Sequence, residues 1–158
     1  MPRVTAWQRL VFGSSAVLLL AAAPAAAQGV GFQGGGTVSP NQFYVGSHFE
    51  VPLGSPQFLL RPGIEGGAGD GVTLASINFE FLYLYELPST NWAIYQGTGP
   101  AVNFARIGDS TSVRGGFNLV FGVRHETGFF SELKIGGSGS PNLRYGVGFT
   151  INTGRSDP

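Results

Sequence analysis

The strongest constraint in this sequence is an alternation of bulky apolar residues with small or polar ones, which recurs along most of the chain. Near the C-terminal end, one parity holds Leu143, Tyr145, Val147, Phe149 and Ile151, and the other holds Asn142, Arg144, Gly146, Gly148, Thr150 and Asn152. Successive side chains of a β-strand point to opposite sides, whereas an amphipathic helix repeats after about 3.6 residues. The period of two therefore predicts an all-β protein.

Clusters of Gly, Pro, Asn, Asp and Ser divide the chain into short segments, as turns do between strands. The predicted strands are 28–37, 42–53, 57–66, 72–86, 91–107, 112–125, 128–136 and 142–152. All of them reach the length of about 9–11 residues that a tilted membrane strand requires. The rhythm predicts an antiparallel up-and-down barrel of eight strands that spans a membrane.

The first 27 residues have the features of an export signal rather than of the fold. Arg3 and Arg9 precede an apolar stretch over 10–23, and small residues follow at Ala25 and Ala27. A positive start, an apolar core and a small-residue cleavage site are typical of a secretory signal peptide. The competing interpretation is a membrane anchor, but the stretch is short for a span of about 20 residues. We expect a signal peptide at 1–27, a barrel domain at 28–152 and a short tail at 153–158.

Composition decides which parity faces lipid. Charged residues make up 11% of the chain, against about 25% in a typical soluble domain. The interior of an eight-stranded barrel is just wide enough for side chains, and the bulky apolar parity would overcrowd it. The whole chain contains 26 Gly, and the other parity is rich in them. That parity also has too few charged residues for a water-facing surface. The predicted lipid-facing residues are Phe79, Phe81, Tyr83, Tyr85, Trp92, Phe117, Phe121, Tyr145 and Phe149.

Nearly all the charge in the predicted strands falls on the polar parity. These residues are Glu50, Arg61, Glu65, Glu80, Arg114, Arg124, Glu132, Lys134 and Arg144. Buried charges must be paired, so we expect a polar network of Arg–Glu pairs that plugs the lumen. The alternative is a narrow pore in which the same charges form a selectivity ring. The small bore of eight strands favours the plug.

Several residues depart from the pattern. Four apolar residues stand on the polar parity, namely Leu82, Leu84, Val120 and Phe130. Gln96 and Thr98 stand on the apolar parity. Pro62 and Pro100 interrupt predicted strands, and we expect a bulge or a local break of the ladder at each. The first segment, 28–37, is mostly Gly, which leaves an open or six-stranded arrangement as an alternative.

Aromatic and glycine residues recur in a characteristic order in the later segments. They are Tyr95-Gln-Gly97-Thr-Gly99-Pro-Ala-Val-Asn103-Phe104-Ala-Arg106, Gly115-Gly116-Phe117-Asn118-Leu-Val-Phe-Gly122-Val-Arg124, Phe130-Ser-Glu132-Leu-Lys134 and Arg144-Tyr145-Gly146-Val-Gly148-Phe149. On these residues the chain resembles the small outer-membrane β-barrel proteins of the OmpA/OmpX and opacity-porin type, over most of 41–152. Such proteins usually end on an aromatic residue, whereas here 150–158 follow Phe149.

The sequence offers no catalytic, cofactor or metal site. There is no Cys, and His48 on the lumen parity has no second ligand at metal-binding spacing, so we expect it to be a packed core residue. His125 and Ser131 suggest a serine hydrolase, but the first falls at a turn and the second on the lipid parity. Gly97-Thr-Gly99 lacks a third Gly and a helix, and 66–71 lacks the Lys of a phosphate loop. The formal net charge of zero gives no reason to expect a nucleic-acid partner.

The expected function is an outer-membrane barrel with a structural or surface-interaction role and no enzymatic activity. Its expected partners are outer-membrane lipid and, during biogenesis, the barrel-insertion machinery. Tyr83, Tyr85 and Trp92 flank the turn at Pro88-Ser89 and are expected in the periplasmic aromatic girdle, with both chain ends in the periplasm. The alternatives are a soluble, lipocalin-like periplasmic barrel that binds an apolar ligand, and a narrow pore or lipid-modifying barrel enzyme.

Overall fold

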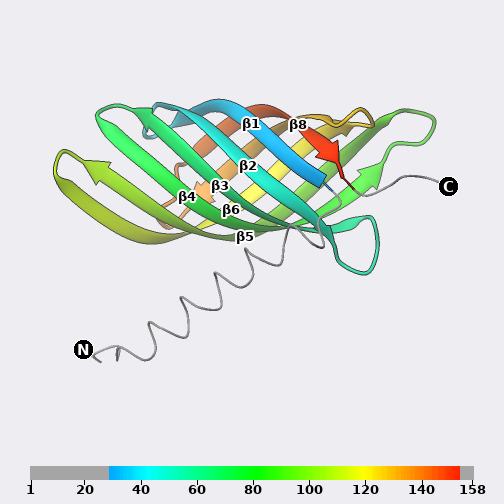
Figure 1. The fold of residues 1–158 in the computed structure, drawn as a ribbon, viewed down its shortest axis with the longest axis horizontal. Coiled ribbons are helices and arrows are strands. Elements are labelled where there is room, and N and C mark those ends of the chain that lie inside the picture. The colour runs from blue at the N-terminus through cyan, green and yellow to red at the C-terminus, as the bar shows by residue number, and fades with distance from the viewer. Residues whose placement is uncertain (1–28, 154–158) are drawn as a thin grey trace, which may run out of the picture.

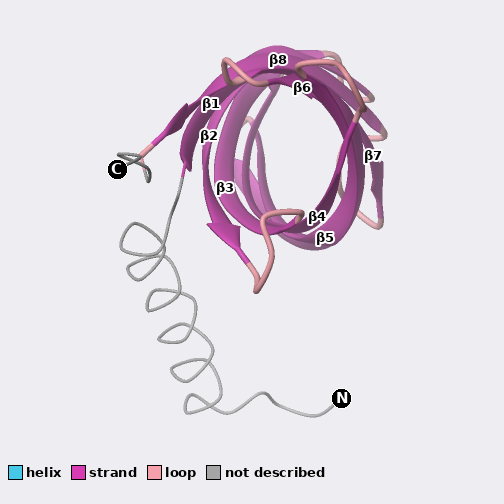
Figure 2. Cartoon of the chain, turned by 90° about the vertical axis from the view of Figure 1, so that its right-hand side faces the viewer, coloured by secondary structure: helices cyan, strands magenta, loops and turns pink. Residues whose placement is uncertain are grey.

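The computed structural model describes residues 29–153, which form one closed barrel of antiparallel strands (Figure 1 and Figure 2). The strands are β1 (Gly29–Val38), β2 (Gln42–Pro52), β3 (Phe58–Gly69), β4 (Val72–Glu86), β5 (Trp92–Ile107), β6 (Ser110–His125), β7 (Phe129–Gly137) and β8 (Leu143–Asn152). The predicted all-β class and the predicted number of strands are confirmed. Within the described residues, no helix is long and apolar enough to cross a membrane. The expected signal peptide lies outside the described residues.

Each strand pairs with its neighbours in sequence, and the first strand pairs with the last. The pairing of β1 with β8 runs from Gly29 opposite Asn152 to Val38 opposite Leu143. Although β1 is rich in Gly, it therefore has a full ladder on both sides. The closed arrangement excludes the open and six-stranded alternatives, and it leaves no long free edge at the seam.

The connections lie at two rims of the barrel. The terminal rim carries Gly29, Asn152 and the connections 53–57, 87–91 and 126–128. The opposite, hairpin rim carries the connections 39–41, 70–71, 108–109 and 138–142. β5 and β6 are the longest strands, and their hairpin extends furthest from the barrel at the hairpin rim (Figure 1).

The turn between β3 and β4 is tighter than the sequence suggests. The ladder continues to Gly69, so the loop expected over 66–71 shrinks to Asp70 and Gly71. Both residues have a positive φ, of 48° and 70°, which is the conformation of a type I′ hairpin turn. Asp-Gly suits this turn because Gly has no Cβ to clash and Asp tolerates the left-handed region. The Asp70 carboxylate also accepts a hydrogen bond of 2.9 Å from the Asn41 amide of the neighbouring hairpin.

The two strand prolines lie at breaks in the ladder, as expected. Between β2 and β3, pairing runs to His48 opposite Gly63 and resumes at Val51 opposite Leu60, skipping Pro62. Between β4 and β5, pairing stops on one side of Pro100 and resumes on the other. The register is the same before and after each break, so neither is a bulge. Proline has no N–H to donate, which explains why pairing lapses locally while the strand continues.

Candidate functional site

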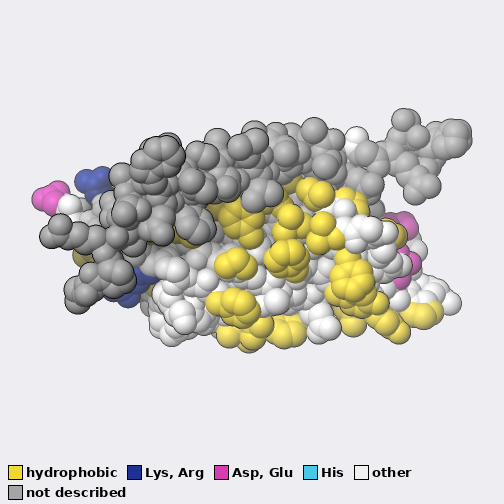
Figure 3. All heavy atoms as spheres, turned by 90° about the horizontal axis from the view of Figure 1, so that it is seen from below, with side chains coloured by type: hydrophobic (Ala, Val, Ile, Leu, Met, Phe, Trp, Pro, Cys, Tyr) yellow, Lys and Arg dark blue, Asp and Glu magenta, His cyan; other side chains and the backbone are white. Residues whose placement is uncertain are grey.

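The apolar parity forms the outer surface of the barrel. Large apolar side chains are exposed on all eight strands, for example Phe81 at 52% and Tyr145 at 55%. Every residue predicted to face lipid is on this outer side, although Phe79 and Tyr83 are only half-exposed. On the face seen in Figure 3, apolar side chains cover the middle of the wall, and the visible charged side chains lie towards its ends. The lipocalin-like alternative required these side chains inside, and the structure places them outside.

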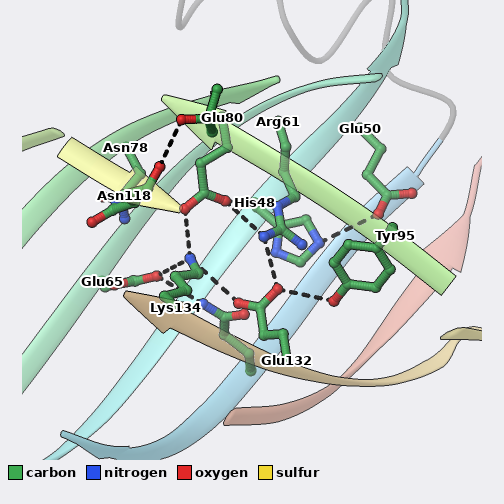
Figure 4. A network of polar contacts seen from close by, with 12 residues as sticks. His48, Glu50, Arg61, Glu65, Asn78, Glu80, Tyr95, Asn118, Glu132 and Lys134 are labelled. Atoms are coloured by element: carbon green, nitrogen blue, oxygen red, sulfur yellow. Dashed lines mark hydrogen bonds and ion pairs between the residues drawn. The ribbon is translucent and has the colours of Figure 1, made fainter. Parts of the chain in front are cut away.

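The polar parity faces the lumen, and it carries an ionic layer at mid-height. We use this name for six residues, contributed by β3, β4, β7 and β8: Arg61, Glu65, Glu80, Glu132, Lys134 and Arg144. All six side chains are buried. Figure 4 shows that those it labels point towards one another across the lumen. The layer contains as many basic as acidic groups, so its formal charge is zero.

Arg61 joins the two carboxylates on either side of it. Its Nη2 atom lies 2.7 Å from Oε2 of Glu80 and 2.7 Å from Oε2 of Glu132, and its Nε donates a second bond of 2.9 Å to Glu80. These partners are 19 and 71 residues away in the sequence. The planar guanidinium suits such multiple contacts, because its donors are fixed in a fork.

Lys134 and Arg144 complete the ionic layer. Lys134 Nζ lies 2.6 Å from Glu65 Oε1, 2.8 Å from Glu80 Oε1 and 3.3 Å from Glu132 Oε1. Arg144 Nη1 lies 2.5 Å from Glu65 Oε2. Each carboxylate of the layer therefore contacts two basic side chains, which is the pairing that a buried charge requires.

A smaller charged group lies between the ionic layer and the terminal rim. Arg124 Nη1 lies 2.7 Å from Glu50 Oε2, and His48 Nε2 lies 3.7 Å from the other oxygen of Glu50. The buried His48 ring also packs against Phe130, with ring centroids 5.5 Å apart. This environment agrees with a packed core histidine. Within residues 29–153, no three His, Asp or Glu side chains gather as metal ligands would.

An apolar layer fills the lumen beside this charged group. Its buried members are Leu59, Leu82, Tyr95, Val120 and Phe130, and Leu84 packs against them. The exceptions to the sequence alternation are thus the residues that close this end of the lumen. Tyr95 connects the apolar and ionic layers, because its hydroxyl donates a bond of 3.0 Å to Glu132 Oε2. Its ring also lies 5.7 Å from the Arg61 guanidinium carbon, at cation–π distance.

Glycines on the inner parity make room for these large side chains. A Cβ on Gly31 would overlap the His48 ring, one on Gly122 would overlap the Tyr95 ring, and one on Gly148 would overlap the Phe130 ring. The high glycine content of the polar parity is therefore a packing requirement. A narrow lumen holds aromatic rings only where the facing wall has no side chain of its own.

A neutral amide layer lies between the ionic layer and the hairpin rim. Its members are Ser76, Asn78, Asn103, Asn118 and Ser140, all buried. Hydrogen bonds connect Ser76 to Asn103 at 2.6 Å, Asn103 to Ser140 at 3.1 Å and Asn118 to Asn78 at 3.0 Å. Arg144 donates a bond of 2.6 Å to Asn118 and so joins the amide and ionic layers. Sequence analysis did not propose a site for these residues. Parity pointed Ser76, Asn78, Asn103 and Asn118 to the lumen, whereas Ser140 lies in the connection 138–142, which has no strand parity.

The prediction that Arg114 belongs to the lumen network is wrong. β6 pairs with β7 only between Phe117 and Arg124, so the segment 110–116 projects beyond β7 and Arg114 is exposed. No carboxylate in the described part of the chain forms an ion pair with it. Ser131 and His125, the two residues that suggested a hydrolase, form hydrogen bonds with different partners and not with each other. Ser131 donates to the Tyr145 hydroxyl at 3.2 Å, and His125 Nδ1 lies 2.9 Å from the Thr127 hydroxyl.

The lumen has little free space where the charged and apolar layers meet. A cavity of about 10 Å³ lies among Glu50, Arg61, Tyr95 and Phe130. One water molecule needs about 10–15 Å³ by this measure. A larger hollow of about 560 Å³ opens on the outer wall instead, over β4 to β8.

No protein-family model matches the sequence, and no curated protein matches it. Among solved structures, the barrel is similar to Neisserial surface protein A, with a TM-score of 0.62 and 13% identity over 78% of this chain and 94% of that one. It is also similar to the N-terminal β-barrel domain of Pseudomonas aeruginosa OprF, with a TM-score of 0.55 and 17% identity over 79% of this chain and 98% of that one. The fold expected from the resemblance to small outer-membrane barrels is confirmed.

Proposed function

We propose that this chain is an outer-membrane β-barrel with a structural or surface-interaction role, whose lumen is closed by its ionic and apolar layers. The observation that carries the proposal is the inverted distribution of side chains. Large apolar groups cover the outside of every strand, while charged side chains whose formal charges sum to zero are buried inside. A protein dissolved in water exposes far smaller apolar patches, whereas a membrane barrel needs such a belt.

Two features support closure rather than conduction. Ion pairs cross the lumen between β3, β4, β7 and β8, so the charged side chains occupy the space that ions would need. The apolar layer adds a second obstruction towards the terminal rim, and the space beside it is about 10 Å³. A water-filled path would require these paired groups to separate, and breaking a buried ion pair is strongly unfavourable.

The orientation follows from the two rims. Tyr85 and Trp92 are exposed next to the connection 87–91 at the terminal rim, where amphipathic rings suit a membrane–water boundary. We infer that the terminal rim is in the periplasm, which agrees with export of the chain by the signal peptide that the sequence predicts at 1–27. The hairpin rim then faces outwards, and its short connections suit contacts with small surface areas. Lipid and the barrel-insertion machinery are the partners that this placement implies.

The placement is tested by cell fractionation with gel electrophoresis of boiled and unboiled samples. We expect the mature protein in the outer-membrane fraction, with different migration before and after boiling. The closed lumen is tested separately by recording currents from the purified barrel in planar bilayers. We expect no steady single-channel current, and large steady currents would contradict the plug and favour the narrow pore.

A pair of variants tests which surface faces lipid. Phe81→Arg puts a charge on the outer wall well inside β4. It should lower the free energy of unfolding in membranes by about 2–4 kcal/mol. Phe43→Arg makes the same change beside the hairpin rim, where the cost should be about 0–1 kcal/mol. Urea titration of the barrel in lipid vesicles measures both. Equal effects at the two positions would argue against a membrane belt.

A further inference from the structure

The hairpin formed by β5 and β6 has one paired edge and one free edge. β5 is paired with β4 as far as its last residue. β6 begins at Ser110 but pairs with β7 only from Phe117, so the segment 110–116 has no strand on that side. In the described part of the chain, no backbone hydrogen bond from the connection 138–142 takes the place of the missing strand. The hairpin that extends furthest from the barrel therefore carries a short, open sheet edge (Figure 1).

The geometry of the turn determines which backbone groups this edge offers. A two-residue turn joins β5 to β6, so the pair of residues next to the turn is hydrogen-bonded. Hydrogen-bonded and non-hydrogen-bonded pairs then alternate along the antiparallel ladder. The N–H and C=O groups of Thr111, Val113 and Gly115 therefore point away from β5. A Cβ on Gly139 would lie 3.0 Å from the Gly115 carbonyl oxygen, so the connection 138–142 covers that end and leaves Thr111 and Val113 open.

In the proposed membrane placement, this edge lies outside the hydrocarbon. Residues 110–115 are exposed on both faces of the hairpin. The hairpin carries the charged residues Arg106, Asp109 and Arg114, and its β6 side is otherwise mostly Ser, Thr and Gly. Charged side chains are costly in the apolar band of a membrane barrel, so we place the hairpin beyond that band. The edge is then accessible to other proteins on the outward side of the membrane.

Arg114 determines which kind of strand fits the edge. Its side chain is exposed, and no carboxylate within residues 29–153 forms an ion pair with it. Because its backbone groups bond to β5, Arg114 stands at a non-hydrogen-bonded position on the free side, where the side chains of paired antiparallel strands are closest. A carboxylate opposite it is attracted, and a basic residue is repelled. Val113 points to the other face of the hairpin with 61% exposure, and it suits an apolar neighbour.

We propose that the free edge of β6 binds an extended, acidic segment of another protein, which adds a strand to the sheet. This partner deepens the proposed surface-interaction role, on which the inference rests. Backbone hydrogen bonds to Thr111 and Val113 hold the segment, and alternate side chains select it, an acidic one facing Arg114 and an apolar one facing Val113. A second copy of the same edge does not supply this chemistry, because 110–116 contain no Asp or Glu.

Peptide binding to the folded barrel in detergent micelles tests the edge. The probe is a labelled synthetic peptide in which Glu and Val alternate, and its control carries Lys in place of Glu. Fluorescence anisotropy should show binding of the Glu peptide and only background for the Lys peptide. Equal binding of the two peptides would overturn the proposal.

A pair of variants at one position tests strand pairing. Val113→Pro removes a free N–H and leaves the bonds between β5 and β6 in place, because proline is tolerated where the N–H faces solvent. It should weaken binding of the Glu peptide by about 3- to 10-fold, as expected for one lost hydrogen bond. Val113→Thr keeps the N–H and the branched side chain, and this matched control should bind like the wild type. Equal binding by the two variants would contradict strand addition.

Arg114→Met tests the charge. It should weaken binding of the Glu peptide by about 1.5- to 5-fold, which corresponds to one pair of opposite charges across strands. Loss of binding in Arg114→Met but not in Val113→Pro would indicate a charge contact without strand pairing, and would overturn the proposal.

Hydrogen exchange measured by NMR locates the bound segment. The amides of Thr111 and Val113 should exchange quickly in the free barrel, and the Glu peptide should slow both. Slow exchange of these two amides without peptide would show that the edge is not free. A folded, membrane-inserted barrel that binds neither peptide would overturn the docking edge alone. Recovery of the protein in the soluble fraction would instead overturn the membrane placement.

Discussion

The ionic layer and the amide layer bury polar groups in the same lumen, but by different chemistry. In the ionic layer, each carboxylate contacts two basic side chains, and Lys134 alone contacts three carboxylates. In the amide layer, single hydrogen bonds connect different segments, for example β6 to β4 through Asn118 and Asn78, and Nδ2 of Asn78 has no partner among the described residues. The first arrangement pairs every charge, although Nε of Arg144 also lacks a hydrogen-bond partner among the described residues, whereas the second rests on single neutral bonds. A small water molecule can replace a lost amide contact, whereas it compensates a lost charge poorly.

The largest expected effect breaks the ionic layer. Arg61→Met removes the shared partner of Glu80 and Glu132, and leaves two buried carboxylates to the single charge of Lys134. We expect a loss of about 3–5 kcal/mol in the free energy of unfolding, measured by urea titration in vesicles. Arg114→Met is the matched control, since the exposed Arg114 should change stability by less than about 0.5 kcal/mol. Similar losses for both arginines would refute the special role of the layer.

A smaller effect should follow where the two layers meet. Asn118→Ala removes the bonds to Asn78 and to the Arg144 guanidinium. Leaving these buried donors and acceptors unpaired should cost about 1–3 kcal/mol, because one of them is charged. The same titration measures the loss. A loss as large as that of Arg61→Met would show that the amide layer is not the more tolerant of the two.

Within the amide layer, the expected effect is smaller again. Ser76→Ala removes the neutral bond to Asn103, which keeps its other bond to Ser140. A neutral hydrogen bond contributes about 0.5–1.5 kcal/mol, so we expect a loss in that range. A loss of less than about 0.3 kcal/mol would be smaller than the contribution of one neutral hydrogen bond. It would indicate that water already hydrogen-bonds to the polar groups at this end of the lumen.

The smallest expected effect sharpens the comparison by changing the solvent. Salt screens exposed charges over a Debye length of about 10 Å at 0.1 M and about 3 Å at 1 M, but it screens buried pairs much less. The destabilisation caused by Arg61→Met should therefore be the same, within error, at 0.1 M and 1 M salt. The two titrations need only be repeated at each concentration. A loss that halves in high salt would mean that water and ions reach the ionic layer.

The strands could be predicted from the sequence because parity and turn residues are local signals. The predicted segment 72–86 coincides with β4, and most other ends differ by one or two residues. β3 is the main exception, because the glycines before Asp70 suggested a loop but continue the ladder. Such glycines are compatible with both structures, and only the partner strands decide between them.

The contents of the lumen could be predicted, but not the contacts. Parity placed Arg61 and Glu132 inside, yet their pairing across 71 residues depends on the register of several strands. The same limit explains Arg114, since its parity is correct but nothing local reveals that β7 ends before reaching it. Leu82, Val120 and Phe130 looked like faults in the pattern. They are needed because side chains must fill the space of a narrow lumen, in addition to balancing its charges.

The pairing of Gly29 with Asn152 has a practical consequence for anyone who wishes to use this barrel as a scaffold. An even number of strands returns the chain to its starting rim, so cargo fused before Gly29 or after Asn152 begins on the same side of the wall. The two-residue turn at Asp70-Gly71 is on the other side. A peptide grafted there and a reporter fused at either end would therefore be separated by the full height of the barrel. The barrel could then display the peptide on one side of the membrane and carry the reporter on the other.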